Sequence, residues 1–157
     1  MAKRTVHFEW RNEPQEGFGY KFKSKAEYRW AQYLQKLLEM GAIQKWEYEP
    51  RQFDFKERYR KKRVYTPDFF VEDLDPIDGE IIPVYHEVKT GMRQVDVRRF
   101  KYMNADYPKV KMVLVLTSKP SGRTAASRKQ IILIGQAEKY VERTVYAGPL
   151  YRKFGIK

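Results

Sequence analysis

The sequence contains no cysteine and only two histidines among its 157 residues. Without cysteine, neither a disulfide nor a cysteine-ligated zinc site can form. With His7 and His86 as the only imidazoles, a catalytic metal would be bound mainly through oxygen, which favours Mg²⁺ or Mn²⁺ over Zn²⁺.

Long apolar runs are also absent. Segments such as 112–116 and 131–135 are far too short to span a bilayer. The first ten residues lack the apolar core of a secretory signal, so we expect a cytoplasmic protein. The length predicts one domain over residues 1–157.

Positive charge is abundant. Lysine and arginine number 32 against 20 aspartates and glutamates, which gives a net charge of +12. Such an excess indicates a polyanionic partner, and nucleic acid is the commonest one. A solvated basic surface, or attraction to a ribosome or a membrane, is the alternative reading.

The clearest helix is predicted over residues 24–41. Ser24 suits the N-cap position, and Gly41 suits the residue after the last turn. Apolar residues recur in this segment at helical spacing: Ala31, Leu34, Leu37 and Leu38.

The remaining segments are expected to complete an α/β fold with a mixed sheet. Strands are predicted at 4–10, 43–55 (bent at Pro50), 64–72, 81–90 and 111–118, a turn at 73–80, a helix at 93–107 and a basic loop at 119–129. Residues 131–135 fit a strand or a helix equally well. Between 24 and 118 the order is helix, three strands, helix, strand.

Three charged residues on two of these predicted strands are candidate site residues: Asp68, Glu87 and Lys89. Glu87 and Lys89 are two residues apart, so they share one face of their strand. On the preceding strand, Val64, Thr66, Asp68 and Phe70 are predicted to share a face. If the two strands pair as an antiparallel hairpin, Asp68 and Glu87 lie side by side. Two carboxylates that close repel each other, and a divalent cation between them would remove that cost.

Simpler explanations exist for each residue. Glu87 and Lys89 could form a surface salt bridge beside an exposed Asp68. Glu27 lies on the same helical stripe as Trp30, Ala31 and Leu34 and should face the sheet, but Ser24 and Glu27 also match a capping box.

Taken together, these residues fit phosphodiester hydrolysis. The reaction needs an attacking water and neutralisation of charge on the phosphate, and a carboxylate-bound metal can assist both. A lysine near the metal would orient the water and stabilise the developing charge.

The pattern resembles the PD-(D/E)XK nuclease superfamily. The matching residues are Pro67-Asp68, Glu87-Val88-Lys89 and the helix residue Glu27. The surrounding sequence, over about residues 20–117, is similar to bacteriophage nucleases of this superfamily, to bacteriophage endonuclease I and to archaeal-type Holliday junction resolvases. The resemblance implies a restriction-endonuclease-like domain with an αβββαβ core at about 20–117, followed by a C-terminal extension at 118–157.

The resemblance also implies roles for individual residues. Asp68 and Glu87 would bind Mg²⁺, or Mn²⁺ in its place, with help from the Val88 carbonyl and from Glu27. Lys89 would assist the attacking water, so that the catalytic set is Glu27, Asp68, Glu87 and Lys89.

The expected activity is that of a magnesium-dependent DNA endonuclease acting in recombination, most simply a Holliday junction resolvase. Because two strands must be cut, a homodimer is expected, located in the host cytoplasm if a bacteriophage encodes it. A restriction-like or nicking nuclease and a non-catalytic DNA-binding protein with the same fold are the alternatives.

Basic residues in several segments are predicted to contact DNA phosphates. They are Lys23, Lys25, Arg60, Lys61, Lys62, Arg63, Arg98, Arg99, Lys101, Arg123, Arg128 and Lys129. For any one of them, an ordinary solvated position is the alternative.

Overall fold

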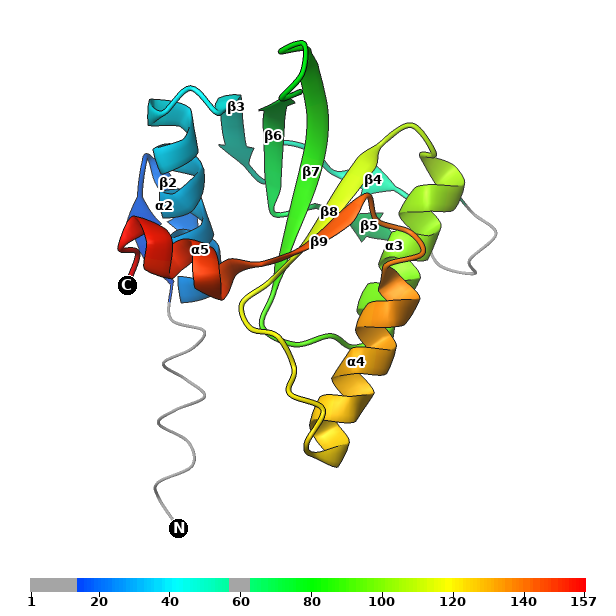
Figure 1. Cartoon of the computed structure of the whole chain (residues 1–157). Helices are drawn as coiled ribbons and strands as arrows, with labels where there is room; N and C mark the ends of the chain where they lie inside the picture. Colours follow the sequence, from blue (N-terminus) through cyan, green and yellow to red (C-terminus); the bar gives the residue numbers. More distant parts are fainter. Residues whose placement is uncertain (1–13, 57–62) are drawn as a thin grey trace.

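The computed structural model describes residues 14–56 and 63–157, and it shows a mixed α/β architecture (Figure 1). The main sheet has the strand order β3-β6-β7-β8-β9. Its strands are β3 (Ile43–Tyr48), β6 (Phe69–Leu74), β7 (Ile81–Lys89), β8 (Lys111–Leu116) and β9 (Arg143–Tyr146). β6 is antiparallel to β3 and β7, whereas β8 is parallel to β7 and β9. The predicted α/β class with a mixed sheet is confirmed.

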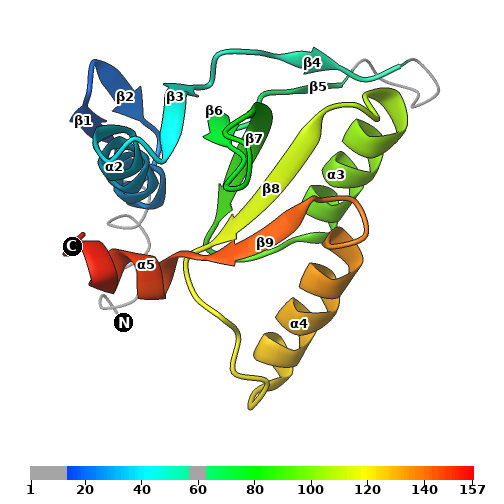
Figure 2. The ribbon, with the colours of Figure 1, turned by 45° about the horizontal axis from the view of Figure 1, so that its top comes forward.

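Within the described ranges, four helices cover the two faces of this sheet (Figure 2). They are α2 (Lys25–Glu39) and α5 (Ala147–Phe154) on one face, and α3 (Gln94–Asp106) and α4 (Ala125–Ala137) on the other. None of the helices in the described ranges is long and apolar enough to cross a membrane.

The predicted signals fix the ends of α2. The Ser24 side chain accepts a hydrogen bond from the backbone N–H of Glu27 at 3.2 Å, as an N-cap should. Gly41 has φ 72°, the left-handed conformation in which glycine commonly terminates a helix.

The strand β8 divides the core into two halves. Val113 and Val115 pack on the α2 side, and Leu114 and Leu116 pack on the α3 side. All four are 2% exposed or less. An uninterrupted apolar run is therefore required here, because this strand is buried on both faces.

The described residues also form two short two-stranded sheets: β1 (Gln15–Gly17) with β2 (Tyr20–Phe22), and β4 (Phe53–Asp54) with β5 (Val64–Tyr65). The order α2, β3, β6, β7, α3, β8 reproduces the predicted αβββαβ sequence, with β4 and β5 inserted after β3. The predicted strand at 4–10 and residues 57–62 lie outside the described residues.

The prediction of one continuous strand over 64–72 is wrong. Val64 and Tyr65 belong to β5, which pairs with β4, and the main-sheet strand begins only at Phe69. Pro67 explains the break, because it has no N–H to donate and restricts the residue before it. Val64 therefore does not share a sheet face with Asp68.

The basic loop predicted at 119–129 is also wrong in its second half. α4 begins at Ala125, and the Thr124 side chain caps it by accepting from Ser127 N at 3.1 Å. Residues 131–135 continue this helix. The extension after residue 118 then adds β9 to the edge of the main sheet and α5 to the α2 face.

Candidate active site

Asp68 directly precedes β6 and Glu87 lies near the end of β7. Both strands are in the middle of the sheet, and these ends of them lie where α2, α3 and α4 begin (Figure 1). Phe69 pairs with His86 in the antiparallel register, so the next pair outward is Asp68 and Glu87. Directly opposed residues of such a pair project from the same face. Both side chains are buried, at 9% and 5% exposure.

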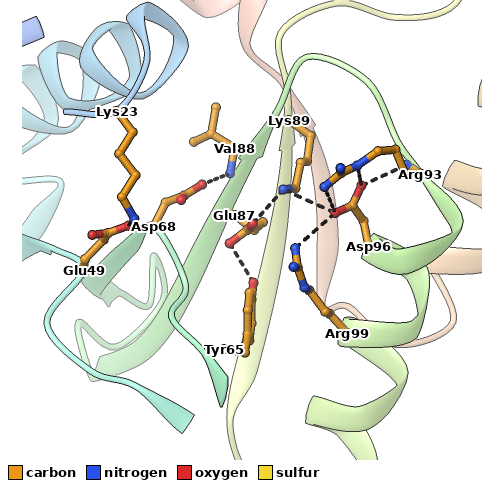
Figure 3. Close-up of polar contacts among 10 residues, drawn as sticks. All are labelled: Lys23, Glu49, Tyr65, Asp68, Glu87, Val88, Lys89, Arg93, Asp96 and Arg99. Atoms are coloured by element: carbon orange, nitrogen blue, oxygen red, sulfur yellow. Dashed lines mark hydrogen bonds and ion pairs between the residues drawn. The ribbon is translucent and has the colours of Figure 1, made fainter. Parts of the chain in front are cut away.

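Each of these carboxylates is held by donors from the protein (Figure 3). Asp68 Oδ2 accepts a hydrogen bond from the backbone N–H of Val88 at 2.8 Å. Glu87 Oε2 accepts one from the Tyr65 hydroxyl at 2.6 Å, and its Oε1 lies 3.0 Å from Lys89 Nζ. The predicted shared face of Glu87 and Lys89 is therefore confirmed, and the pair is not at an exposed surface.

Asp96 lies on the other side of Lys89. Its Oδ1 is 3.4 Å from Lys89 Nζ and 3.5 Å from Arg99 Nη1, while its Oδ2 accepts from the Arg93 backbone N–H at 2.9 Å. Asp96 is only 1% exposed. The ammonium group of Lys89 is thus fixed between two buried carboxylates, Glu87 and Asp96.

Glu27 approaches the site from the first turn of α2. Its Oε2 accepts from the Tyr48 hydroxyl at 2.6 Å and from the Lys23 backbone N–H at 3.1 Å. Glu27 therefore stabilises the start of the helix, although through Lys23 and not through the Ser24 N–H of a standard capping box.

A further ion pair closes this side of the site. The Lys23 ammonium binds the Glu49 carboxylate, and Figure 3 shows the pair beside Asp68. The Glu49 N–H donates to the Asp68 carbonyl at 2.8 Å. Glu49 has φ 44°, a left-handed conformation that costs a non-glycine residue about 1–3 kcal/mol. Such strain is concentrated at functional sites.

The electrostatics of the site are those of crowded carboxylates. Burial raises the pKa of Asp68 well above its ordinary value, and the charges of Glu87 and Glu27 raise it further. Burial alone would lower the pKa of Lys89, but the charges of Glu87 and Asp96 outweigh it and raise the pKa. Lys89 is therefore a cation at neutral pH. The Asp68–Glu87 pair is under electrostatic strain that a cation would relieve.

The donor set suits a hard divalent cation. Asp68 and Glu87 offer carboxylate oxygens from adjacent strands, and oxygen ligands are those that Mg²⁺ prefers. Within residues 14–56 and 63–157, however, no three acidic, histidine or cysteine side chains gather into a ready metal cage. Two carboxylates with water completing the shell is the arrangement usual for Mg²⁺, so the residues fit the ion.

The predicted phosphate-contacting residues divide into several groups. Lys23 and Lys25 lie at the start of α2; Arg63 precedes β5; Arg98, Arg99 and Lys101 lie on α3; Arg123 precedes α4; Arg128 and Lys129 lie on its first turns. Arg99 also contacts Asp96, and Lys23 contacts Glu49. Arg60, Lys61 and Lys62 lie outside the described residues.

Three contributors were not predicted from the sequence: Tyr65, Asp96 and Glu49. Tyr65 is separated from Glu87 by a full hairpin, so no local spacing connects them. Asp96 occupies the third position of a helix, where an acidic residue is common for capping alone. The feature that indicates a special position for Glu49 is its left-handed backbone conformation, which cannot be recognised in the sequence.

The fold and site define a mixed α/β domain with a buried, lysine-paired carboxylate centre at the ends of two inner strands, β6 and β7. The chain belongs to the DUF1064 family, described as a protein of unknown function, whose family model matches residues 15–121. The matched segment includes Glu27, Asp68, Glu87, Lys89 and Asp96, and ends before α4. No curated protein and no solved structure matches the chain.

The environment of Asp96 leads to a prediction about stability. Asp96→Asn removes the anion that holds Lys89, Arg93 and Arg99. At pH 7 the substitution should lower the free energy of unfolding by about 1–3 kcal/mol, because the buried carboxylate loses its hydrogen-bonded ion pairs. The loss is not larger because the arginine partners are partly exposed and solvent weakens these ion pairs. The cations around Asp96 depress its folded-state pKa despite burial. The stabilisation of the fold by ionised Asp96 is therefore fully present above its ordinary pKa of 3.8. It is lost as the pH falls through the lower pKa that Asp96 has in the folded protein.

Urea unfolding at pH 7 and pH 3 measures this difference. The exposed Asp54 on β4 provides the control, and Asp54→Asn should change little at either pH. An Asp96→Asn deficit that is the same at both values would show that packing, not charge, is responsible.

Proposed function

We propose that this protein is a magnesium-dependent DNA endonuclease of the PD-(D/E)XK type, with a restriction-endonuclease-like domain. The single observation that carries the proposal is the burial of Asp68 beside Glu87 and Lys89, where β6 begins and β7 ends, with Lys89 in contact with Glu87. A structural salt bridge would not require a second carboxylate to be buried against the first, because that arrangement is destabilising by itself.

In this proposal each residue of the site has a distinct task. Asp68 and Glu87 hold the metal, with the Val88 carbonyl and Glu27 available in support. A bound Mg²⁺ would neutralise charge on the phosphate and make a nearby water more acidic. Lys89, kept cationic by its neighbours, donates to the attacking water and to the charge that develops on the phosphate. Asp96 is a positioning residue that aims the Lys89 ammonium.

The choice of DNA as substrate is supported by the net charge of +12 and by basic residues on α2, α3 and α4. These three helices begin at the end of the sheet where β6 begins and β7 ends, which is where the site lies (Figure 1). Branched DNA is favoured by the resemblance to junction resolvases, and a homodimer would place two such sites on two strands.

Cleavage of a labelled four-way junction, compared with linear duplex and single-stranded DNA, tests the function. With Mg²⁺ we expect paired cuts near the branch point and little cutting of linear DNA. Equal cutting of all three substrates would favour a restriction-like or nicking nuclease. Binding without any cutting, in Mg²⁺ or Mn²⁺, would favour a non-catalytic DNA-binding protein. This is the alternative because no cluster of three metal-ligating side chains is found among the described residues.

The salt dependence of DNA binding gives a second test. Arg128 and Lys129 are exposed on α4, and replacing both with alanine should weaken binding and reduce the slope of log K against log salt by about 0.9 for each lost phosphate contact. Lys139→Ala, an exposed lysine just after α4, is the control. An unchanged slope in the double variant would remove α4 from the DNA-binding surface.

A further inference from the structure

A crevice beside the candidate active site has no part in the proposed cleavage chemistry, because none of the proposed catalytic residues lines it. It has a volume of about 400 Å³ and lies between α3 and the β4–β5 ribbon. Figure 2 shows this ribbon on the α3 side of the sheet. The volume is within the range of small-ligand pockets.

Three arginines line this crevice: Arg63, Arg98 and Arg99. No aspartate or glutamate is among its described lining residues. Within the described part of the chain, Arg99 has an acidic partner in Asp96, whereas no acidic side chain lies within ion-pair distance of Arg63 or Arg98. Three guanidinium groups around one concavity repel each other, and an anion between them would remove that cost.

The other described lining residues are apolar or aromatic. Phe55 is 5% exposed, and its ring meets that of Tyr102 edge to face with centroids 5.5 Å apart. Val64, which is 51% exposed, and Val95 are the remaining lining residues in the described ranges. A concavity with guanidinium groups and aromatic walls suits a phosphate joined to a sugar and a base better than it suits an inorganic anion alone.

Two lining residues, Val64 and Arg99, connect the crevice to the candidate active site. Val64 precedes Tyr65, whose hydroxyl donates to Glu87 at 2.6 Å. Arg99 contacts Asp96, which in turn contacts Lys89. A strand with one phosphate beside Lys89 would therefore extend a neighbouring nucleotide toward these arginines.

We infer that this crevice is a nucleotide subsite, which binds the phosphate of one DNA residue through Arg63, Arg98 and Arg99 and its sugar and base against Val64 and Tyr102. The inference rests on the proposed nuclease function for naming DNA as the ligand. The subsite adds what the metal site lacks: it fixes which phosphate of the strand reaches Lys89.

Thymidine 5′-monophosphate is the probe, titrated into the metal-free protein with EDTA present and followed by NMR chemical shifts. We expect saturable binding, with the largest shifts at Val64 and Tyr102, and weaker binding of thymidine and of inorganic phosphate. Arg98→Ala should weaken binding of the nucleotide about tenfold or more, because a hydrogen-bonded charge contact is lost. Arg98→Lys should retain part of the affinity.

Arg152→Ala is the matched control, since Arg152 is also an exposed helical arginine but lies on α5, on the opposite face of the sheet. Equal affinity for thymidine and its monophosphate, or equal weakening by Arg98→Ala and Arg152→Ala, would overturn the subsite. The titration needs no cleavage, so an inactive protein that binds the nucleotide would refute the nuclease function alone. A protein that cuts DNA but does not bind the probe would refute the subsite alone.

Discussion

Asp68→Asn should abolish DNA cleavage while leaving the fold and DNA binding intact. The asparagine side chain has the same shape, and its carbonyl oxygen can still accept from the Val88 N–H, as Asp68 Oδ2 does at 2.8 Å. A neutral amide is a poor ligand for Mg²⁺, so metal-dependent chemistry should fall by more than about 10³-fold. Binding should be equal or tighter, because one negative charge facing the phosphates is removed.

The same substitution should not destabilise the protein. Burial and the charges of Glu87 and Glu27 raise the folded-state pKa of Asp68, so ionised Asp68 opposes folding at neutral pH. Removing the charge should therefore leave the melting temperature at pH 7 unchanged or higher. Lost activity with equal or increased stability is typical of a residue retained for function.

Three measurements on a four-way junction separate these effects: cleavage in Mg²⁺, binding in Ca²⁺, and thermal unfolding without DNA. Asp54→Asn, an exposed carboxylate on β4, is the control and should behave as the wild-type protein in all three. If Asp68→Asn cuts at the wild-type rate, the carboxylate centre is not the active site, and a binding role becomes the better explanation.

The parts of this fold that the sequence predicts are those with strong local signals. The helix α2 has a cap, an apolar stripe and a terminal glycine. The strand β8 has the continuous apolar run that is typical of a strand buried on both faces. The face shared by Glu87 and Lys89 follows from strand geometry alone. These features depend on neighbouring residues and need no knowledge of the tertiary structure.

The errors occur where tertiary contacts decide. β5 leaves the line of β6 to pair with β4, and a pattern of strand-forming residues does not reveal which partner a strand takes. The segment at 125–129 becomes helical because α4 continues through residues 131–135 and packs Leu133 and Ile134 into the core. The predicted basic, glycine-containing loop is present only before Ala125, where α4 begins.

The candidate site shows the same division. Asp68, Glu87 and Lys89 are found by motif and register, whereas Tyr65 and Asp96 are found only once α3 and β5 are placed beside β7. Asp96 changes the interpretation of Lys89. A lysine paired with Glu87 alone could be a simple salt bridge, but one held between two buried carboxylates has its ammonium group fixed in place.

Lys89→Ala should reduce cleavage by about 10²–10³-fold, the usual cost of losing one preorganised charge contact in a transition state. Mn²⁺ binding to the DNA-free protein should persist, because no metal ligand is removed, and this separates Lys89→Ala from Asp68→Asn. The edge strand β3 carries a matched control: the exposed Lys45 pairs with Glu47 at the same two-residue spacing, and Lys45→Ala should cut as the wild-type protein does. Lys89→Met preserves the aliphatic stem and tests for lost packing. If it cuts normally while Lys89→Ala does not, the lysine supports the strand and its charge has no part in the chemistry.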